Sequence, residues 1–312
     1  MVEIGVERGP MGTGNENFGH VLALFTMILW GTTLVSTKVL LVDFTPLEIL
    51  IFRFALGSVA LTLIYPKRLK GTTRHQELMF MAAGLCGVTL YFLLENIALT
   101  YTLASHTGII LSASPFITAM LAHRFLKDER LRMTFFIGFT VAVSGIILIN
   151  LNGILAPDLN PLGDLLALSA ATVWAFYSIL MKKISSYEYN MIQCTRRTFF
   201  YGLMFMLPAI LFLPFELDLG RFADPVNLFN ILFLGLGASA MCFVTWNTAV
   251  KRIGAVKTNM YLYMLPTVTI ITALIVLDEQ LTWLIVCGAA LTMIGLFISE
   301  NKAKRVNRLF EK

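Results

Sequence analysis

The chain has 312 residues, of which 57% are hydrophobic and only 14% carry a charge. A typical soluble domain has about 25% charged residues, so this composition excludes an ordinary soluble protein. The net charge of +5 does not indicate a nucleic-acid partner, because the basic residues concentrate in loops between apolar segments.

Ten apolar stretches follow one another along the chain, each close to the roughly 20 residues that a helix needs to cross a bilayer. Helices are expected because every backbone polar group must be satisfied within lipid. We therefore predict an all-α integral membrane protein with ten transmembrane helices. The stretches cover residues 20–41, 46–65, 76–98, 102–123, 133–151, 162–181, 190–214, 227–249, 258–277 and 281–299.

The two ends of the chain are polar. Residues 1–18 are rich in glycine and predict a disordered tail, and residues 301–312 form a basic tail. The four cysteines lie within apolar stretches and have no metal-ligand spacing, so we expect neither disulfides nor a bound metal, and no cofactor. No zinc-protease motif, serine-hydrolase motif or phosphate-binding loop occurs, so we expect neither an enzyme nor direct ATP drive.

The basic residues are distributed unequally between the two sides of the predicted bundle. If the loops are numbered alternately, the side that holds both tails carries 19 of the 24 Lys and Arg residues, whereas the loops of the other side carry Arg221 alone. By the positive-inside rule, the basic side is cytoplasmic. Both termini are therefore expected inside the cell, with the protein in the plasma (inner) membrane.

The sequence repeats itself at an offset of 151 residues, where for example Asn96 matches Asn247 and Pro115 matches Pro266. Earlier in the chain the offset is 144, and Trp30 matches Trp174. We therefore predict two five-helix repeats, residues 19–152 and 153–300. Since five is odd, the second repeat must cross the membrane in the opposite direction, as in many secondary transporters.

The charges of equivalent loops agree with this inversion. "PKRLKGTTR" after the second stretch is basic, whereas its counterpart "PFELDLGRFAD" after the seventh is acidic. "KDERLR" after the fourth stretch is basic, whereas "LDEQLTW" after the ninth has no Lys or Arg. The same loop thus faces opposite sides of the membrane in the two repeats.

Specific segments of the first repeat resemble a known family. "LWGTTLVSTK", "FRFALGSVAL", "NIALTYTLASHTGIILSASPFITAMLA" and "DERL", with their counterparts in the second repeat, are similar to EamA-type units of the drug/metabolite transporter superfamily. The resemblance covers residues 20–299 and implies ten helices around a central cavity and export of amino acids and other small metabolites. One departure puts a local turn in doubt, because Asp128 and Asp278 stand where the family usually has glycine.

Charged residues within apolar stretches are the candidate coupling or charge-relay groups, because a charge at a helix centre costs roughly 2.5–3.5 kcal/mol on insertion scales. Glu95 is either a proton-coupling or substrate-amine site, or a structural group paired with Lys38 or Arg53 or reaching water. Arg53 and its counterpart Arg197 are expected to share a structural role. The complete set is Glu95, Lys38, Arg53, His106, Lys182 and Arg197.

The prolines Pro115 and Pro266 are candidate gating positions, because each removes one backbone donor within a predicted helix. Asn259, Tyr263 and Pro266 share one face of the ninth stretch, and Ser112 lies on the equivalent face of the fourth. These faces are either a cavity lining or a close packing surface of small residues. The candidate substrate-binding set is Trp30, Thr33, Ser112, Trp174, Tyr177, Asn259 and Tyr263.

These patterns predict a secondary-active transporter, functional as a monomer, that exports small metabolites such as amino acids through a pathway lined by the first, fourth, sixth and ninth stretches. Its expected partners are the lipid bilayer, a small-molecule substrate and protons as a candidate coupling ion. Lys182 and Arg197, interpreted as an inner cationic pair with no acid beside it, would favour a carboxylate. The same pair suggests the alternative, an organic-anion or phosphate-ester exchanger.

Overall fold

The structure, a computed structural model, describes residues 13–126, 133–154, 161–278 and 283–301. Within these ranges every regular element is a helix and no strand occurs. The elements of the first half, in chain order, are α1 (Thr13–Leu40), α2 (Pro46–Ile64), α3 (Arg74–Gly84), the π-helical segment η1 (Leu85–Leu90), α4 (Tyr91–Tyr101), α5 (Ala104–Leu111), α6 (Ser114–Phe125) and α7 (Met133–Ile154).

The second half has a similar succession of elements. They are α8 (Pro161–Ser185), α9 (Met191–Met206), the 3₁₀ segments η2 (Leu207–Leu211) and η3 (Leu219–Ala223), α10 (Pro225–Leu232), the π-helical segment η4 (Phe233–Met241), α11 (Cys242–Ile253), α12 (Ala255–Met260), the 3₁₀ segment η5 (Tyr261–Met264), α13 (Leu265–Val276) and α14 (Trp283–Asn301).

Seven helical spans of the described chain, several of them made of consecutive elements, are long and apolar enough to cross a membrane. They are Glu16–Leu40, Pro46–Ile64, Arg74–Tyr101, Ala104–Phe125, Pro161–Ser185, Pro225–Ile253 and Ala255–Val276. The other three predicted stretches fall on α7, α9 and α14, which do not meet this criterion over the described residues. Ten crossings thus remain a prediction.

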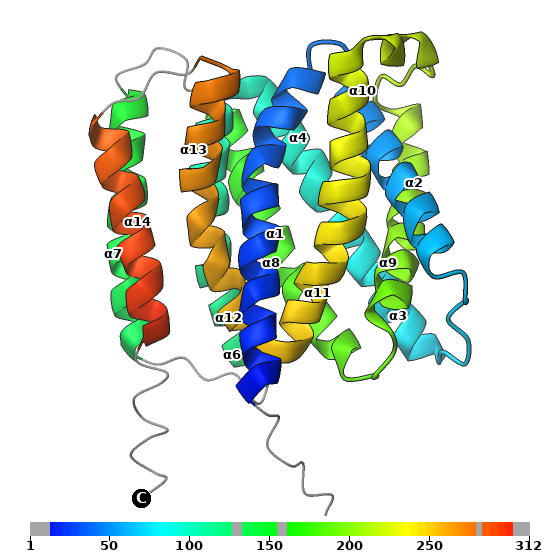
Figure 1. Cartoon of the computed structure of the whole chain (residues 1–312), viewed down its shortest axis with the longest axis horizontal. Coiled ribbons are helices and arrows are strands. Elements are labelled where there is room, and N and C mark those ends of the chain that lie inside the picture. Colours follow the sequence, from blue (N-terminus) through cyan, green and yellow to red (C-terminus); the bar gives the residue numbers. More distant parts are fainter. Residues whose placement is uncertain (1–12, 127–132, 155–160, 279–282, 302–312) are drawn as a thin grey trace, which may run out of the picture.

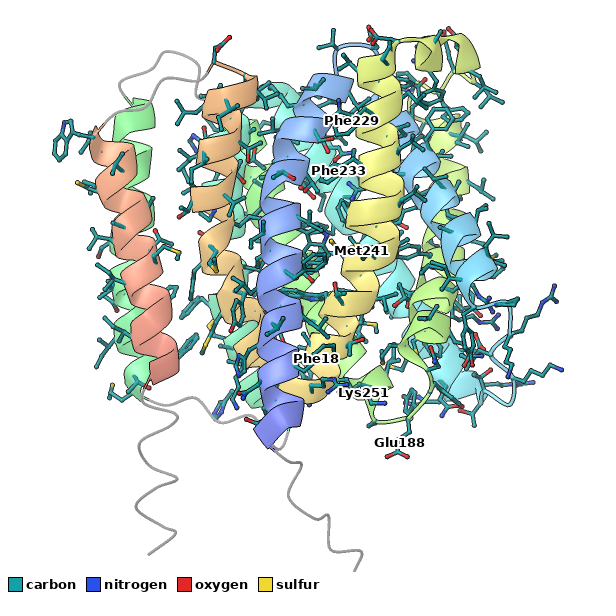
Figure 2. The ribbon with its side chains drawn as sticks, in the orientation of Figure 1. Phe18, Glu188, Phe229, Phe233, Met241 and Lys251 are labelled. Atoms are coloured by element: carbon teal, nitrogen blue, oxygen red, sulfur yellow. The ribbon has the colours of Figure 1, made fainter. Side chains whose placement is uncertain are left out.

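The helices pack side by side as one bundle (Figure 1). The start of α1, the loop 65–73 and the end of α14 lie at one end of the bundle, and η3 lies at the opposite end (Figure 1). Phe18, Glu188 and Lys251 lie toward the first end, whereas Phe229 lies toward the other (Figure 2).

The third apolar helix of each half contains a π-helical segment. In the first half η1 lies between α3 and α4, and in the second half η4 lies between α10 and α11. These segments occupy equivalent places in the sequence repeat, because Gly84 and Gly235 are 151 residues apart. π-helical turns within α-helices often occur at functional sites.

The start of α1 differs from the prediction, and the structure describes one of the two turns that the sequence put in doubt. Residues 13–18 of the predicted tail belong to α1, whose first turn contains Glu16, an acid that the positive helix N-terminus favours. Residues 1–12 and 302–312 lie outside the described residues, as does Asp128. Asp278 has φ 53°, the left-handed region that glycine favours, so this turn keeps a glycine-like conformation.

A carboxylate joins two segments at the end of the bundle that contains η3. Glu48 is 1% exposed and accepts hydrogen bonds from Thr45 N (2.8 Å), Glu216 N (2.7 Å) and Arg221 Nη1 (2.9 Å). The hydrogen bond to Glu48 raises the pKa of Arg221 above its ordinary value. Since the guanidinium also stacks on Phe44, this cluster fixes the residue 212–224 segment against the start of α2.

Helices α7 and α14 pack closely because glycines meet at their interface. A Cβ atom added to Gly295 would lie 2.5 Å from the Gly138 carbonyl oxygen and 2.6 Å from the Ala142 backbone nitrogen. A Cβ on Gly145 would likewise clash with the carbonyl oxygen of Gly288. Small residues that let backbones approach are the usual basis of such helix pairs in membranes.

We predict that Gly295→Ala destabilises the folded protein by about 1–3 kcal/mol, because the added methyl group meets backbone rather than a movable side chain. Gly237→Ala is the matched control, since its Cβ would meet only the Phe233 ring, at 3.6 Å. Thermal unfolding of the purified protein in detergent measures both. Equal midpoints for the two variants would contradict this account of the α7–α14 interface.

Candidate functional site

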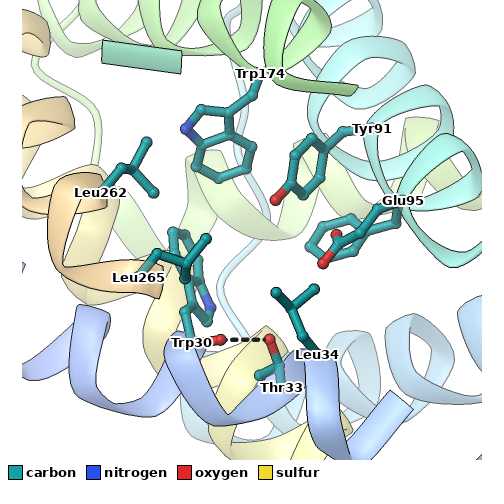
Figure 3. A pocket seen from close by; sticks show the side chains of 9 residues that line it. Trp30, Thr33, Leu34, Tyr91, Glu95, Trp174, Leu262 and Leu265 are labelled. Carbon is teal, nitrogen blue, oxygen red and sulfur yellow. Dashed lines mark hydrogen bonds between the residues drawn. The ribbon is translucent and has the colours of Figure 1, made fainter. Parts of the chain in front are cut away.

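A small cavity lies at the centre of the bundle, between the two halves of the chain (Figure 3). Its volume, measured for the centre of a water molecule, is about 20 Å³. One water needs roughly 10–15 Å³ by this measure, so the cavity is far too small for a metabolite in this conformation. It is lined by Trp30, Thr33, Leu34, Tyr91, Phe92, Glu95, Trp174, Leu262 and Leu265.

The two tryptophans predicted from the repeat meet at this cavity. The rings of Trp30 on α1 and Trp174 on α8 are 5.2 Å apart between centroids and nearly perpendicular, at 83°. Trp30 Nε1 donates to the Ala238 carbonyl oxygen in η4 at 2.9 Å. Both side chains are buried, so this edge-to-face contact joins the first and second halves of the chain.

Asn259 on α12 holds the Trp174 ring in place. Its Oδ1 accepts from Trp174 Nε1 at 3.1 Å and from the Ser178 hydroxyl at 3.3 Å, while its Nδ2 donates to the Ala255 carbonyl at 2.9 Å. The predicted substrate-binding residue Asn259 therefore lies beside the cavity as a support for an indole that lines it.

Glu95 is the acidic residue of the cavity lining and is 5% exposed. Its Oε2 has no hydrogen-bond partner. Tyr91 and Arg53 interact with it electrostatically, but the structure contains no direct Arg53–Glu95 ion pair. Arg53 instead donates from Nε to Ser239 Oγ at 3.0 Å, and its guanidinium lies over the Phe92 ring, 4.4 Å from the centroid.

The other two predicted charge-relay residues of the first repeat bind elsewhere. Lys38 Nζ donates to the carbonyl oxygens of Leu99 (2.5 Å) and Thr102 (2.9 Å) at the end of α4. His106 Nε2 lies 3.2 Å from Asp164 Oδ1 on α8. Neither residue lines the cavity.

The predicted inner cationic pair is wrong in one respect, because Arg197 has a carboxylate partner. Its Nε and Nη2 contact the Glu77 carboxylate at 3.0 and 2.8 Å, and Tyr201 also donates to that group. Glu77 lies 120 positions earlier in the chain, so the pairing depends on how α3 packs against α9. Lys182 lies half-buried in the last turn of α8.

Thr33 lines the cavity, and its hydroxyl donates to the Trp30 carbonyl at 2.7 Å. Tyr177 lies outside the lining and donates to Asn247 Oδ1 at 2.8 Å. Ser112 is fully buried and its hydroxyl donates to the Ile109 carbonyl at 2.5 Å. Of these three residues, Thr33 lines the cavity, whereas Tyr177 and Ser112 do not.

Tyr263 points into a separate cluster. It packs with Ala119, Phe135 and Met260, and its buried hydroxyl has no hydrogen-bond partner. The expectation that Asn259 and Tyr263 share a face used the α-helical period, but residues 261–264 form a 3₁₀ turn. This turn changes the rotation between the two side chains.

Both candidate gating prolines lie where a helix is interrupted. Pro115 is in the first turn of α6, after the break that ends α5, and Pro266 is in the first turn of α13, after η5. Proline is well tolerated in a first helical turn, because the missing donor there has no partner within the helix. Because each proline lies in a first turn, it does not take a hydrogen-bond donor away from a carbonyl within its own helix.

The fourth wall of the cavity is α4, which follows η1, rather than the predicted fourth stretch. That stretch uses its small residues for packing, since a Cβ on Gly108 would lie 3.2 Å from Leu34 and 3.3 Å from Thr269. Apolar patterning gives no distinguishing signal for the lining residues that sequence reasoning missed, which are Leu34, Tyr91, Phe92, Leu262 and Leu265.

Trp246 was also missed, although the repeat offset aligned it with Glu95. It is fully buried, its ring centroid lies 5.1 Å from that of Trp30, and its Nε1 has no hydrogen-bond partner. Aligned positions of the two repeats therefore converge on the centre of the bundle, where the first repeat contributes an acid and the second an indole.

Comparison with known families gives two matches to one family. The EamA-like transporter family matches residues 17–151 and again residues 161–300. The chain is thus built from two copies of one unit.

Curated relatives match the chain along almost its whole length. It is 26% identical over 294 residues to an uncharacterized transporter of Archaeoglobus fulgidus (91% of this chain, 97% of the relative). It is 28% identical over 290 residues to a "Probable amino-acid metabolite efflux pump" of Escherichia coli (strain K12) (89% and 93%). A solved crystal structure has a TM-score of 0.71 at 19% identity, covering 92% of this chain and 98% of that one, and shows a shared fold.

Proposed function

This chain belongs to the EamA-like transporter family, and we propose that it exports small metabolites such as amino acids by secondary-active alternating access. The observation that carries the proposal is the central cavity, where Trp30 and Trp174 from the two repeats meet beside the buried Glu95. An apolar, aromatic lining with few polar groups suits a small amphipathic ligand. The similarity to a relative named as an amino-acid metabolite efflux pump supports the direction and the substrate class.

Alternating access is supported by the closed state of this site. A cavity of about 20 Å³ cannot hold an amino acid, so binding requires its walls to separate. The breaks before Pro115 and Pro266 are natural places for such bending, because interrupted helices often line the midplane sites of transporters. We propose that α6 and α13 move about these breaks.

The proposed topology is ten crossings in two inverted repeats, with both termini cytoplasmic, in a protein that functions as a monomer in the plasma membrane. Three segments that carry basic residues support it, because they share one end of the bundle (Figures 1 and 2). They are the loop 65–73, the last turn of α8 before Glu188, with Lys182 and Lys183, and the helix end at Lys251. Positive residues favour the cytoplasmic side.

We predict that Lys70→Cys and Asp218→Cys react with a membrane-impermeant thiol reagent from opposite faces of the membrane. Intact cells should label Asp218→Cys only, and inverted vesicles should label Lys70→Cys only. A background in which Cys86, Cys194, Cys242 and Cys287 are replaced by serine or alanine is the control. Labelling of both positions from one face would contradict the topology.

We predict that Trp174→Leu lowers efflux of a transported amino acid at least tenfold, because it removes the aromatic contact between the two repeats. Trp283→Leu is the matched control, since Trp283 is 71% exposed at the start of α14. Vesicles loaded with labelled amino acids, organic anions or phosphate esters measure efflux. Unchanged efflux in Trp174→Leu rules out this site, and efflux of anions alone identifies the exchanger alternative.

We propose that Glu95 is also the group that couples transport to protons, because it is a buried carboxylate that lines the cavity. The groups that interact with it are Arg53 and Tyr91. Glu95→Gln removes the titratable group, so the pH dependence of efflux seen with the wild type should flatten while the protein level stays normal. A variant with an unchanged pH profile would show that Glu95 has only a structural role.

A further inference from the structure

We infer that the central cavity selects ligands that carry a positively charged amine and no free carboxylate. The inference rests on the proposed function for its site and narrows the substrate class, from amino acids in general to amine-bearing metabolites whose carboxylate is absent or blocked. Three features of the cavity carry it: an acceptor without a partner, aromatic rings around it, and a lack of free hydrogen-bond donors.

The first feature is the Glu95 carboxylate. In Figure 3 its oxygens point toward the space enclosed by Tyr91, Leu34 and the two indoles. Oε2 is buried and has no hydrogen-bond partner. A buried acceptor without a partner is unfavourable, and more so when it is charged, so a ligand that donates to it relieves that cost. An ammonium group has three donors and the complementary charge.

The second feature is the aromatic enclosure. Tyr91 and Trp174 lie 4.7 Å apart between ring centroids, Trp30 and Trp174 5.2 Å apart, and all three line the cavity with Phe92. The face of an aromatic ring carries partial negative charge, so a cation over it is attracted. A carboxylate in the same position is repelled.

The third feature is that the donors of the lining are already in use. Trp30 Nε1 donates to the Ala238 carbonyl, Trp174 Nε1 to Asn259, and the Thr33 hydroxyl to the Trp30 carbonyl. The Tyr91 hydroxyl interacts with Glu95 itself. A ligand carboxylate would therefore enter a low-dielectric space without a donor to receive it, which is strongly unfavourable.

The nearby cation, Arg53, interacts electrostatically with Glu95 from outside the cavity lining. Arg53 does not line the cavity, and its guanidinium stacks on Phe92, whose ring is part of the lining. Its Nε donates to Ser239 Oγ, and its Nη2 is a buried donor without a partner that belongs to a residue outside the lining. None of the nine lining residues is basic, so no counter-charge for a carboxylate faces the ligand.

A series of ligands with one aromatic ring and different charge tests the inference. At pH 6.5 phenylalanine amide is predominantly cationic, phenylalanine is zwitterionic and N-acetylphenylalanine is anionic. Isothermal titration calorimetry on the purified wild-type protein should show binding of the amide at least tenfold tighter than that of the zwitterion, and no binding of the anion. Because this comparison needs no variant, it stands even if a substitution prevents folding.

Two variants locate the preference. Glu95→Gln should weaken binding of the amide at least tenfold and leave little discrimination between the three ligands. Glu188→Gln, at an exposed position in the loop after α8, is the matched control and should bind as the wild type does. Equal or tighter binding of the zwitterion or the anion by the wild type overturns the inference, as does an amide preference that survives Glu95→Gln.

Flux measurements on the same protein separate this inference from the proposed function. If reconstituted vesicles transport N-acetylphenylalanine independently of Glu95, transport stands and the amine selectivity is wrong. If the amide binds through Glu95 but no ligand crosses the membrane, the selectivity stands and the transport proposal is wrong.

Discussion

The edge-to-face contact between Trp30 and Trp174 is the interaction on which the centre of this bundle depends. The two indoles occupy equivalent positions of the repeated unit and meet 5.2 Å apart, so each half completes the core of the other. Their N–H groups are satisfied by the η4 carbonyl of Ala238 and by Asn259. The membrane interior offers no water for such donors, so η4 and α12 are held against the tryptophans by the same bonds that orient the rings.

The cavity follows from this arrangement. With the indole donors directed outward to backbone and amide acceptors, the rings present only their apolar faces and edges to the cavity. In the lining, Glu95 keeps an acceptor, Oε2, that has no hydrogen-bond partner. A buried, partly unsatisfied carboxylate lowers the stability of a membrane protein. In the proposed transport cycle, a ligand or a proton at Glu95 would stabilise one state over another.

The charged clusters away from the cavity have a different role. The Glu48–Arg221 contact fixes the 212–224 segment near one end of the bundle, and the Glu77–Arg197 contact joins α3 to α9. Arg53 and Arg197, aligned by the repeat, both stack on aromatic rings, Phe92 in one case and Tyr201 in the other. Their polar partners differ, because Arg53 binds Ser239 and Arg197 binds Glu77. The two repeats thus share the position of the cation but not its hydrogen-bond partner.

The sequence by itself determined the features that depend on order along the chain: apolar stretches long enough for membrane helices, the duplication, the family resemblance and the pairing of Trp30 with Trp174. Tertiary structure alone decided which polar groups meet. Arg197 binds Glu77, which lies 120 positions earlier in the chain, and Arg53 donates to Ser239 rather than to Glu95. The 3₁₀ turn at 261–264 directs Tyr263 and Asn259 to different places. The physical reason is that hydrophobic periodicity constrains which face of a helix is apolar, whereas a hydrogen bond depends on rotations and depths that differ by a few ångströms.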